Sequence, residues 1–365
     1  MTILGGAKSF YCFLVSISYE PHFVKKHLPP TWQLVDDGRE QPWLPDSRCV
    51  GKSSRRRFTV IYACPRHQLQ APQVSIKANK VSQLGKAVPE VERLFEYSHA
   101  DPAFANQRRS PEDVIALMDE AGVSQICFSA WSRPGSMIFT NEDVAEFTRA
   151  YPRRIFGLAA VNLHDPVGAV KELEYYVRTE GFVGLRVVPW LWALPPSDAH
   201  YWPLFVKCIE LDIPFLTQVG HTAPACPSEV GRPVPYIDSI ALKFPDLKII
   251  MGHIGYPWAS ETVGVAWKHK NAYIDSSAWS PKYYAAEFVH FANTTGRKKC
   301  MFATNFPQLG FKACVDRVEK YLVNGTGLHG TGGLRKEVIE DFMGGNAIRV
   351  LKLPPLDPKQ PKARL

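Results

Sequence analysis

The sequence predicts an α/β protein, a closed (β/α)8 TIM barrel with a long irregular insertion after its first strand. From residue 110 onward, short apolar runs alternate with segments of helical periodicity. The runs are hydrophobic at successive positions, which is typical of strands buried on both faces of a parallel sheet. With one further run near the N-terminus there are eight such strands, and barrels of this type use roughly 250 residues.

The regular part of the chain begins with a helix that opens at Ser110 and stops at Gly122. Ser110 is a hydroxyl N-cap, Pro111 suits the first helical position, and acidic residues follow at the positive end of the helix dipole. Strands and helices then alternate. The predicted strands are 125–130, 155–160, 183–188, 215–219, 248–252, 272–275 and 300–303, and the helices between them are 141–150, 166–179, 201–211, 236–244, 261–268 and 283–292.

The first strand of the barrel is expected at residues 10–18. Residues 30–108 lack the alternation and are rich in Pro turns, so we interpret them as an insertion that folds as loops over the top of the barrel. Such insertions often form a lid or a dimer contact, which leaves a homodimer open. The prediction is one barrel domain over residues 1–353 and a solvated tail, 354–365. An open doubly wound sheet is the alternative, but the Gly-x-Gly-x-x-Gly at 325–330 follows a predicted helix, not a strand.

Charge and cysteine usage bear on partners and location. The net charge is +8, and the first 110 residues hold 16 Lys and Arg against 9 Asp and Glu, including Arg55–Arg57. A short basic run is most often a solvated loop, and no nucleic-acid signature accompanies it, so we expect no nucleic-acid partner. The eight cysteines are scattered without a Cys-x-x-Cys pair, which favours a reducing compartment. No apolar run reaches the ~18–20 residues of a membrane span. Residues 9–18 resemble a short signal segment, but they lack its flanking pattern, so we predict a cytoplasmic protein with no membrane partner.

Polar residues follow several predicted strands at the end where such barrels carry their function. His221 and His253 come directly after neighbouring strands, each beside a glycine, while Asp275 and Asn305 end or follow the last two strands. For either histidine alone, a structural role with a backbone carbonyl partner is the alternative. Two at neighbouring strand ends favour metal binding or proton transfer, since imidazole does both near neutral pH.

Four segments resemble the amidohydrolase-related family, the TIM-barrel branch that includes aminocarboxymuconate-semialdehyde decarboxylase and related carboxy-lyases and hydrolases. They are Thr217-Gln-Val-Gly-His-Thr222, Pro227-Ser-Glu-Val-Gly-Arg-Pro233, Gly252-His-Ile-Gly-Tyr-Pro-Trp258 and Tyr273-Ile-Asp-Ser-Ser277. The resemblance covers roughly residues 110–350. It implies one divalent metal, usually zinc, bound by a residue pair on the first strand, a His after the fifth and an Asp after the eighth. A second His, after the sixth strand, assists catalysis.

Carried over to this sequence, the resemblance makes His221 a metal ligand and His253 the catalytic histidine. The eighth-strand ligand position holds Asn305, and the two first-strand positions hold Val15 and Ile17. Val and Ile cannot bind a metal, and a neutral amide oxygen is a far weaker zinc ligand than a carboxylate. Three interpretations stay open: ligands from the insertion, such as His67 or His99; a reaction without tightly bound metal; or a protein that binds its ligand without turnover.

The sequence therefore predicts a metal-assisted hydrolase or carboxy-lyase that acts on a small aromatic or unsaturated carboxylate. His253 is the expected acid or base, and Arg186 or Arg232 would bind the substrate carboxylate. Trp258 is one of several aromatic residues near the predicted mouth that would contact a flat ligand. The alternative is a catalytically degenerate family member that acts as a ligand-binding or oligomer-partner protein.

Overall fold

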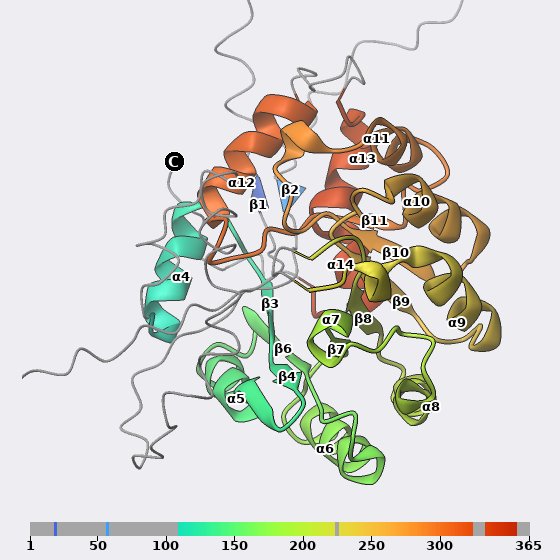
Figure 1. The fold of residues 1–365 in the computed structure, drawn as a ribbon. Helices are drawn as coiled ribbons and strands as arrows, with labels where there is room; N and C mark the ends of the chain where they lie inside the picture. The colour runs from blue at the N-terminus through green and yellow to red at the C-terminus, as the bar shows by residue number, and fades with distance from the viewer. Residues whose placement is uncertain (1–17, 20–55, 58–108, 223–225, 324–332, 356–365) are drawn as a thin grey trace, which may run out of the picture.

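A seven-stranded parallel sheet forms the centre of the protein in the computed structural model (Figure 1). The structure describes residues 18–19, 56–57, 109–222, 226–323 and 333–355. The strands lie in the order β11-β10-β9-β8-β7-β6-β3, so each strand from β6 to β11 is a neighbour of the next one along the chain. The bounds are β3 Ile126–Ser129, β6 Ile155–Ala159, β7 Gly184–Val187, β8 Phe215–Gln218, β9 Ile249–Gly252, β10 Ala272–Asp275 and β11 Cys300–Met301.

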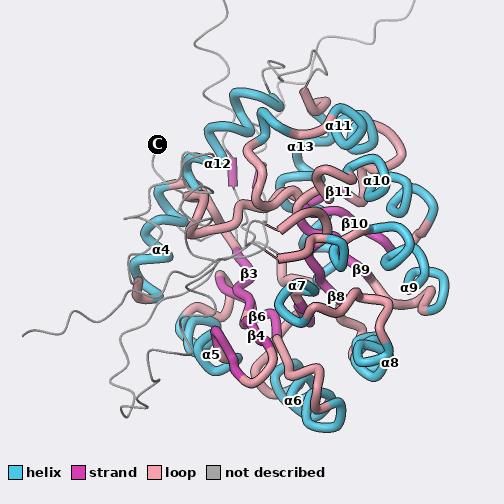
Figure 2. Tube along the Cα trace, in the orientation of Figure 1, coloured by secondary structure: helices cyan, strands magenta, loops and turns pink. Residues whose placement is uncertain are grey.

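Helices surround the sheet on its outer side, and the strands curve into an arc within this ring (Figures 1 and 2). Helix α12 packs against α4, the first helix of the described part of the chain, and this contact brings the two ends of the arc together. The helices are α4 Pro111–Glu120, α5 Asn141–Ala150, α6 Pro166–Arg178, α7 Pro189–Trp192, α8 Trp202–Glu210, α9 Asp238–Lys243, α10 Ala259–Lys268, α11 Ala286–Asn293, α12 Phe311–Val318, α13 Lys336–Glu340 and α14 Asn346–Leu351. Short 3-10 or π-helical turns cover Ala199–Tyr201, Glu229–Gly231, Pro233–Ile237, Pro281–Tyr283, Glu319–Val323 and Asp341–Gly345.

The helix starts follow the predicted capping chemistry. Ser110 Oγ accepts from the Asp113 backbone N–H at 3.2 Å, and the Asp113 carboxylate accepts from the Ser110 N–H at 2.8 Å. Thr140 and Asp143 form the same reciprocal pair at the start of α5. Each capping box satisfies backbone donors that the first helical turn leaves without intrahelical acceptors.

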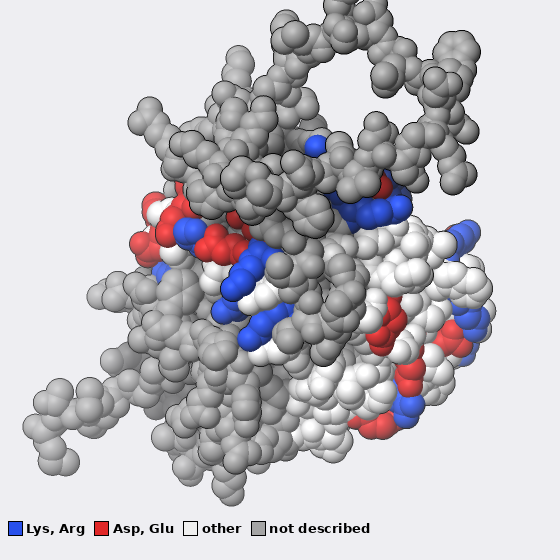
Figure 3. Space-filling model, turned by 90° about the horizontal axis from the view of Figure 1, so that it is seen from above, with Lys and Arg blue, Asp and Glu red and all other residues white. Residues whose placement is uncertain are grey.

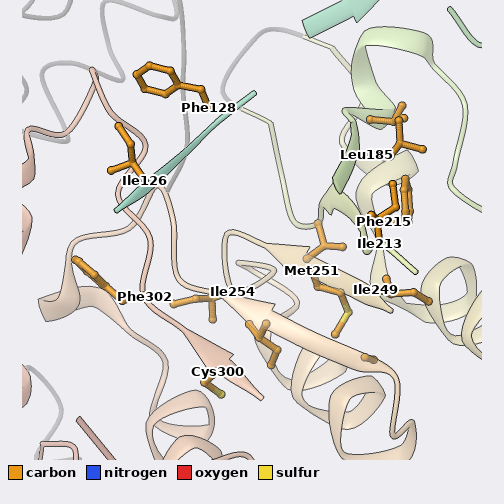
Figure 4. Close-up of a cluster of buried hydrophobic side chains, with 14 of the residues drawn as sticks. Ile126, Phe128, Leu185, Ile213, Phe215, Ile249, Met251, Ile254, Cys300 and Phe302 are labelled. Carbon is orange, nitrogen blue, oxygen red and sulfur yellow. The ribbon is translucent and has the colours of Figure 1, made fainter. Parts of the chain in front are cut away.

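Two apolar clusters pack on opposite sides of the sheet because strand side chains alternate between its faces. The larger cluster fills the space between strands and helices. Figure 4 shows part of it, with side chains from β3, β7, β8, β9 and β11 and from the segments beside them: Ile126, Phe128, Leu185, Ile213, Phe215, Ile249, Met251, Ile254, Cys300 and Phe302.

The smaller cluster lies inside the arc. It combines inward side chains of the strands, residues from the hairpin that follows β3 and from the segment after β11, and residues at the end of α14. Its members are Cys127, Trp131, Phe139, Phe156, Leu158, Leu216, Ile250, Met301, Ala303, Ala347, Val350, Leu351 and Leu353. Gln125, just before β3, donates through Nε2 to the Pro354 carbonyl at 3.0 Å. The α14 segment therefore closes the inside of the arc at the amino ends of the strands, and the carboxyl ends are left for polar residues.

The observed elements agree with the alternation predicted from residue 110 onward. A hairpin of β4 (Trp131–Arg133) and β5 (Ser136–Phe139) was not predicted, and it separates β3 from α5. The predicted first strand, 10–18, lies outside the described residues except for Ser18. Ser18 belongs to β1 (Ser18–Tyr19), which pairs antiparallel with β2 (Arg56–Arg57). The rest of the predicted insertion and residues 356–365 of the predicted tail also lie outside the described residues.

The described surface mixes charges of both signs. On the face shown in Figure 3, Lys and Arg side chains lie in several small groups, most of them near Asp or Glu. None of the helices in the described part of the chain combines the length and the apolar character that crossing a bilayer requires.

Candidate active site

His221 follows β8 in a tightly packed turn. Its backbone N–H donates to the Tyr256 carbonyl at 2.8 Å, which joins the loops after β8 and β9. The preceding Gly220 has φ +93°, and a Cβ there would lie 2.6 Å from the same carbonyl oxygen, so the turn requires glycine. The half-buried imidazole lies edge-on to Tyr256 and Trp279, at 5.6 and 5.8 Å between ring centroids. His221 is therefore fixed at the carboxyl edge beside two aromatic rings.

His253 follows β9 in strained backbone. His253, Ile254 and Gly255 have consecutive positive φ values of 73°, 58° and 83°. For residues other than glycine this conformation costs of order 1–3 kcal/mol each, and it is concentrated at functional sites. The His253 side chain is buried, and its backbone N–H donates to Asp275 Oδ1 at 3.4 Å. The strain turns the chain sharply, so the imidazole stays at the edge of the sheet.

Asp275 ends β10 and is the most perturbed acid of the site. Its Oδ1 accepts from the Ser277 N–H at 2.9 Å, from the Ser277 hydroxyl and from the His253 N–H. A Cβ on Gly252 would lie 2.9 Å from Oδ2, so glycine makes room for the carboxyl group. Burial raises the pKa of Asp275 to about 6, against the opposing effects of these hydrogen bonds and of the Arg186 charge. The sequence placed Asp275 at the edge of the barrel but gave it no role.

Arg186 lies on the inner face of the sheet. In the register of β7, β8 and β9, Arg186 is opposite Leu216, and Leu216 is opposite Ile250, both members of the inner cluster. The buried guanidinium lies over the Trp131 ring, with Cζ 5.1 Å from its centroid. This buried cation is close enough to influence both Asp275 and His253.

The protonation of His253 reflects these neighbours. Burial lowers the pKa of His253 well below its usual value, and the neighbouring Arg186 and His221 act in the same direction. At neutral pH the imidazole is therefore uncharged, and one of its nitrogens accepts while the other donates. The structure thus brings together Arg186, His221, His253 and Asp275, from four consecutive strands or the loops that follow them.

Arg232 and Trp258 lie together at the periphery of this group. The Arg232 guanidinium is 5.6 Å from the Trp258 ring centroid. It donates to Glu261 from Nε at 3.1 Å and from Nη2 at 2.6 Å, and its side chain remains 46% exposed. A guanidinium paired in this way must exchange its carboxylate partner before it can bind another. Arg186, by contrast, is buried on the inner face of the sheet and lies close to His253 and Asp275.

Asn305 follows β11 with φ +84°, a conformation that asparagine tolerates better than most residues. Its Nδ2 donates to Gln308 Oε1 at 2.7 Å, and both side chains are buried. Asn305 Oδ1 has no hydrogen-bond partner within the described residues.

The donors at the edge do not fit the metal site that the resemblance implies. Among the described residues no group of three His, Cys, Asp or Glu side chains is arranged to hold a metal ion. His221 and the neutral oxygen of Asn305 are two donors of the predicted set, whereas catalytic zinc takes three protein ligands. The other two positions, Val15 and Ile17, lie outside the described residues and carry no ligand atom. We therefore assign no chemical step to a metal.

Comparison with known proteins places the chain in a family. An amidohydrolase family model matches residues 94–353. A γ-resorcylate decarboxylase from a Polaromonas species is 28% identical over 213 residues, which cover 47% of this chain and 62% of the relative. The chain spans less than two thirds of the length of the curated relatives it matches.

Two solved structures share the fold. An uncharacterised TIM-barrel protein from Bordetella bronchiseptica has a TM-score of 0.62 at 21% identity, covering 80% of this chain and 98% of that one. A 5-carboxyvanillate decarboxylase from Novosphingobium aromaticivorans, in complex with manganese and 4-hydroxy-3-methoxy-5-nitrobenzoic acid, has a TM-score of 0.53 at 17% identity, covering 75% and 91%. The predicted α/β barrel class is confirmed, and with the family model matching more than half of its length, the chain belongs to the amidohydrolase family.

Proposed function

We propose that this chain binds a small aromatic carboxylate at the carboxyl edge of its sheet and removes the carboxyl group as CO2. The observation that carries the proposal is the pairing of a buried cation, Arg186, with a buried acid of raised pKa, Asp275. Decarboxylation needs both functions, one to hold the carboxylate and one to supply a proton. Two relatives named as decarboxylases of hydroxylated benzoates support the choice of substrate class.

The reaction assigns one task to each residue. Arg186 binds the substrate carboxylate through charge-assisted hydrogen bonds. Asp275 transfers its proton to the ring carbon that bears the carboxylate; the bond from that carbon to the carboxylate then breaks, its electron pair returns to the ring and CO2 leaves. With a pKa of about 6, roughly a tenth of Asp275 is protonated at pH 7. Since three donors occupy Oδ1, the proton resides on Oδ2, beside Gly252.

Of the two roles predicted for His253, acid or base, the base is the one that its surroundings favour. Its lowered pKa makes the imidazolium scarce at neutral pH, so Asp275 is the better proton donor. The neutral ring can orient the substrate by a hydrogen bond, and it can take a proton from water. That second capacity favours hydrolysis of an aromatic carbonyl compound as the second candidate function.

The other expectations from the sequence remain predictions. The described donors do not support the predicted zinc, and the proposed steps use only side chains of this chain. A cytoplasmic location, the absence of nucleic-acid and membrane partners, a homodimer and the single-domain division remain sequence-based expectations. The alternative function is a catalytically degenerate family member that binds its ligand without turnover. The following experiment distinguishes it from an enzyme.

The test measures turnover and binding in parallel. Purified full-length chain is incubated with 2,6-dihydroxybenzoate or 5-carboxyvanillate, and product and CO2 are quantified. We expect Arg186→Met to raise KM by about 10- to 100-fold, the value of a charge-assisted hydrogen bond, and Asp275→Asn to lower kcat by about 10²- to 10⁴-fold. Arg178→Met, at an exposed site on α6, is the matched control. Binding without turnover would support the binding protein, and neither binding nor turnover would refute the proposal.

A further inference from the structure

The turn after β11 carries a pair of buried amides whose outer atoms have no hydrogen-bond partner among the residues that the structure describes. Asn305 and Gln308 are 3% and 2% exposed, and one hydrogen bond joins them, from Asn305 Nδ2 to Gln308 Oε1. Asn305 Oδ1, an acceptor, and Gln308 Nε2, a donor, have no partner within the described residues. If the O and N assignments of both amides are exchanged, the conclusion is the same, because one acceptor and one donor of the pair are still left without a hydrogen bond.

The turn itself is rigid, so the two amides are held together. The Leu309 N–H donates to the Asn305 carbonyl at 3.3 Å, which closes one helical turn and brings positions 305 and 308 to the same side. The Phe306 N–H donates to Thr304 Oγ1 at 3.1 Å. The buried Phe306 ring stacks on Phe311 with centroids 4.1 Å apart, which anchors the turn to α12.

The pair lies beside the proposed active site. Met301 on β11 is opposite Asp275 on β10, and Asn305 comes four residues later, at the same carboxyl edge. Ser276, next to Asp275, donates from its backbone to the Met301 carbonyl at 3.0 Å and accepts at Oγ from the Ala303 N–H at 3.2 Å. The β11 turn and the proposed acid therefore belong to one hydrogen-bonded unit.

A buried polar atom without a partner costs about 1–3 kcal/mol. An acceptor and a donor left over on two amides that bond to each other therefore favour a ligand group that can both donate and accept. A carboxylate offers acceptors alone and would meet the Asn305 oxygen unfavourably. A divalent metal would find one neutral oxygen and an N–H group at this pair. A hydroxyl group both donates and accepts, and it is neutral like the amides. The chemistry of the pair therefore matches a hydroxyl.

We propose that Asn305 and Gln308 form a specificity site for a hydroxyl group on the ring of the aromatic carboxylate. This inference rests on the proposed function, since the same ligand places its carboxylate at Arg186. Asn305 Oδ1 accepts from the hydroxyl and Gln308 Nε2 donates to it. In this chain, the turn to which the resemblance assigns a metal ligand thus binds a hydroxyl substituent of the substrate.

Isothermal titration of the full chain with benzoate and the three monohydroxybenzoates tests this site. In the wild type we expect at least one hydroxybenzoate to bind about three- to tenfold more tightly than benzoate, as one net hydrogen bond gives. Gln308→Met keeps the volume but removes the donor, and it should reduce this ratio to below about two while benzoate affinity changes little. Asn305→Gly, which keeps the positive φ, is the second variant if Gln308→Met fails to fold. Lys312→Met, an exposed position on α12, is the control and should keep the ratio.

The outcomes separate the two proposals. Benzoate binding without preference for any hydroxybenzoate, or a preference that both variants retain, overturns the hydroxyl site and leaves the proposed function standing. If wild type binds none of the four ligands, the proposed function fails and the hydroxyl site fails with it. A ratio lost in either variant and kept in Lys312→Met supports the site.

Discussion

The buried carboxyl of Asp275 makes the stability of the folded protein depend on pH in a defined direction. Burial raises its pKa from 3.8 to about 6, so the folded state binds this proton more tightly than the unfolded state does. The resulting stabilisation is complete below about pH 4 and is lost as the pH rises through 6. Two pKa units at about 1.4 kcal/mol each give about 3 kcal/mol. Asp275→Asn cannot ionise, yet its amide oxygen can still accept from Ser277 and His253. The variant should therefore gain about 2–3 kcal/mol relative to wild type between pH 4 and pH 7.5.

Urea unfolding of both proteins at half-unit pH steps measures this difference in the free energy of unfolding. The matched control is Asp246→Asn, which removes one negative charge at an exposed position before β9. Subtracting the control isolates the contribution of burial from the general effect of net charge. A difference between wild type and Asp275→Asn that stays flat over this range, or that grows in favour of wild type as the pH rises, would refute the assignment of a buried carboxyl with a raised pKa.

Three further predictions concern glycine conformation, thiol accessibility and metal content. Gly255→Ala should destabilise the protein by more than about 1 kcal/mol, because φ is +83° and the new Cβ would lie 1.8 Å from Thr262 Oγ1. Thermal unfolding measures both variants, and in it Gly264→Ala on α10 should stabilise the protein by about 0.5–1 kcal/mol, since a Cβ there meets nothing within 4 Å. Equal changes in stability for the two variants would contradict both predictions. Brief alkylation of the native protein, mapped by mass spectrometry, should modify the partly exposed Cys226 first. Four buried thiols with raised pKa values should react later: Cys127, Cys208, Cys300 and Cys314. Early labelling of any of these four would contradict the described packing. Elemental analysis after dialysis should find well below one zinc per chain, and a full equivalent would mean that ligands come from outside the described residues.

Local features of this fold were readable from the sequence. The N-cap at Ser110, the apolar strands and the glycines beside the two histidines depend on neighbouring residues, so their signals are contained in short segments. The sequence also placed His221 and His253 at neighbouring strand ends, where the structure has them. Periodicity carries this information because each βα unit must bury its own apolar face.

Features that depend on distant partners were not readable. The raised pKa of Asp275 follows from burial by the whole sheet, and the pairing of Arg232 with Glu261 joins positions 29 residues apart. The sequence did not indicate Gln308 as a site residue, because its hydrogen bond to Asn305 depends on the conformation of one irregular turn and no sequence motif predicts that conformation. The positive φ of His253 likewise gives no sign in the sequence, since the residue is not glycine.

The inner apolar cluster beside Arg186, closed by the end of α14, has a consequence for how this protein could change over evolution. This apolar layer packs the inside of the arc through contacts among its own side chains, so its contribution to stability depends little on which polar groups lie at the carboxyl edge. Exchanging a polar residue at this edge then alters the chemistry while the apolar layer keeps its packing. The same fold can in this way gain, modify or lose a reaction through substitutions at a few positions on the carboxyl edge of its sheet.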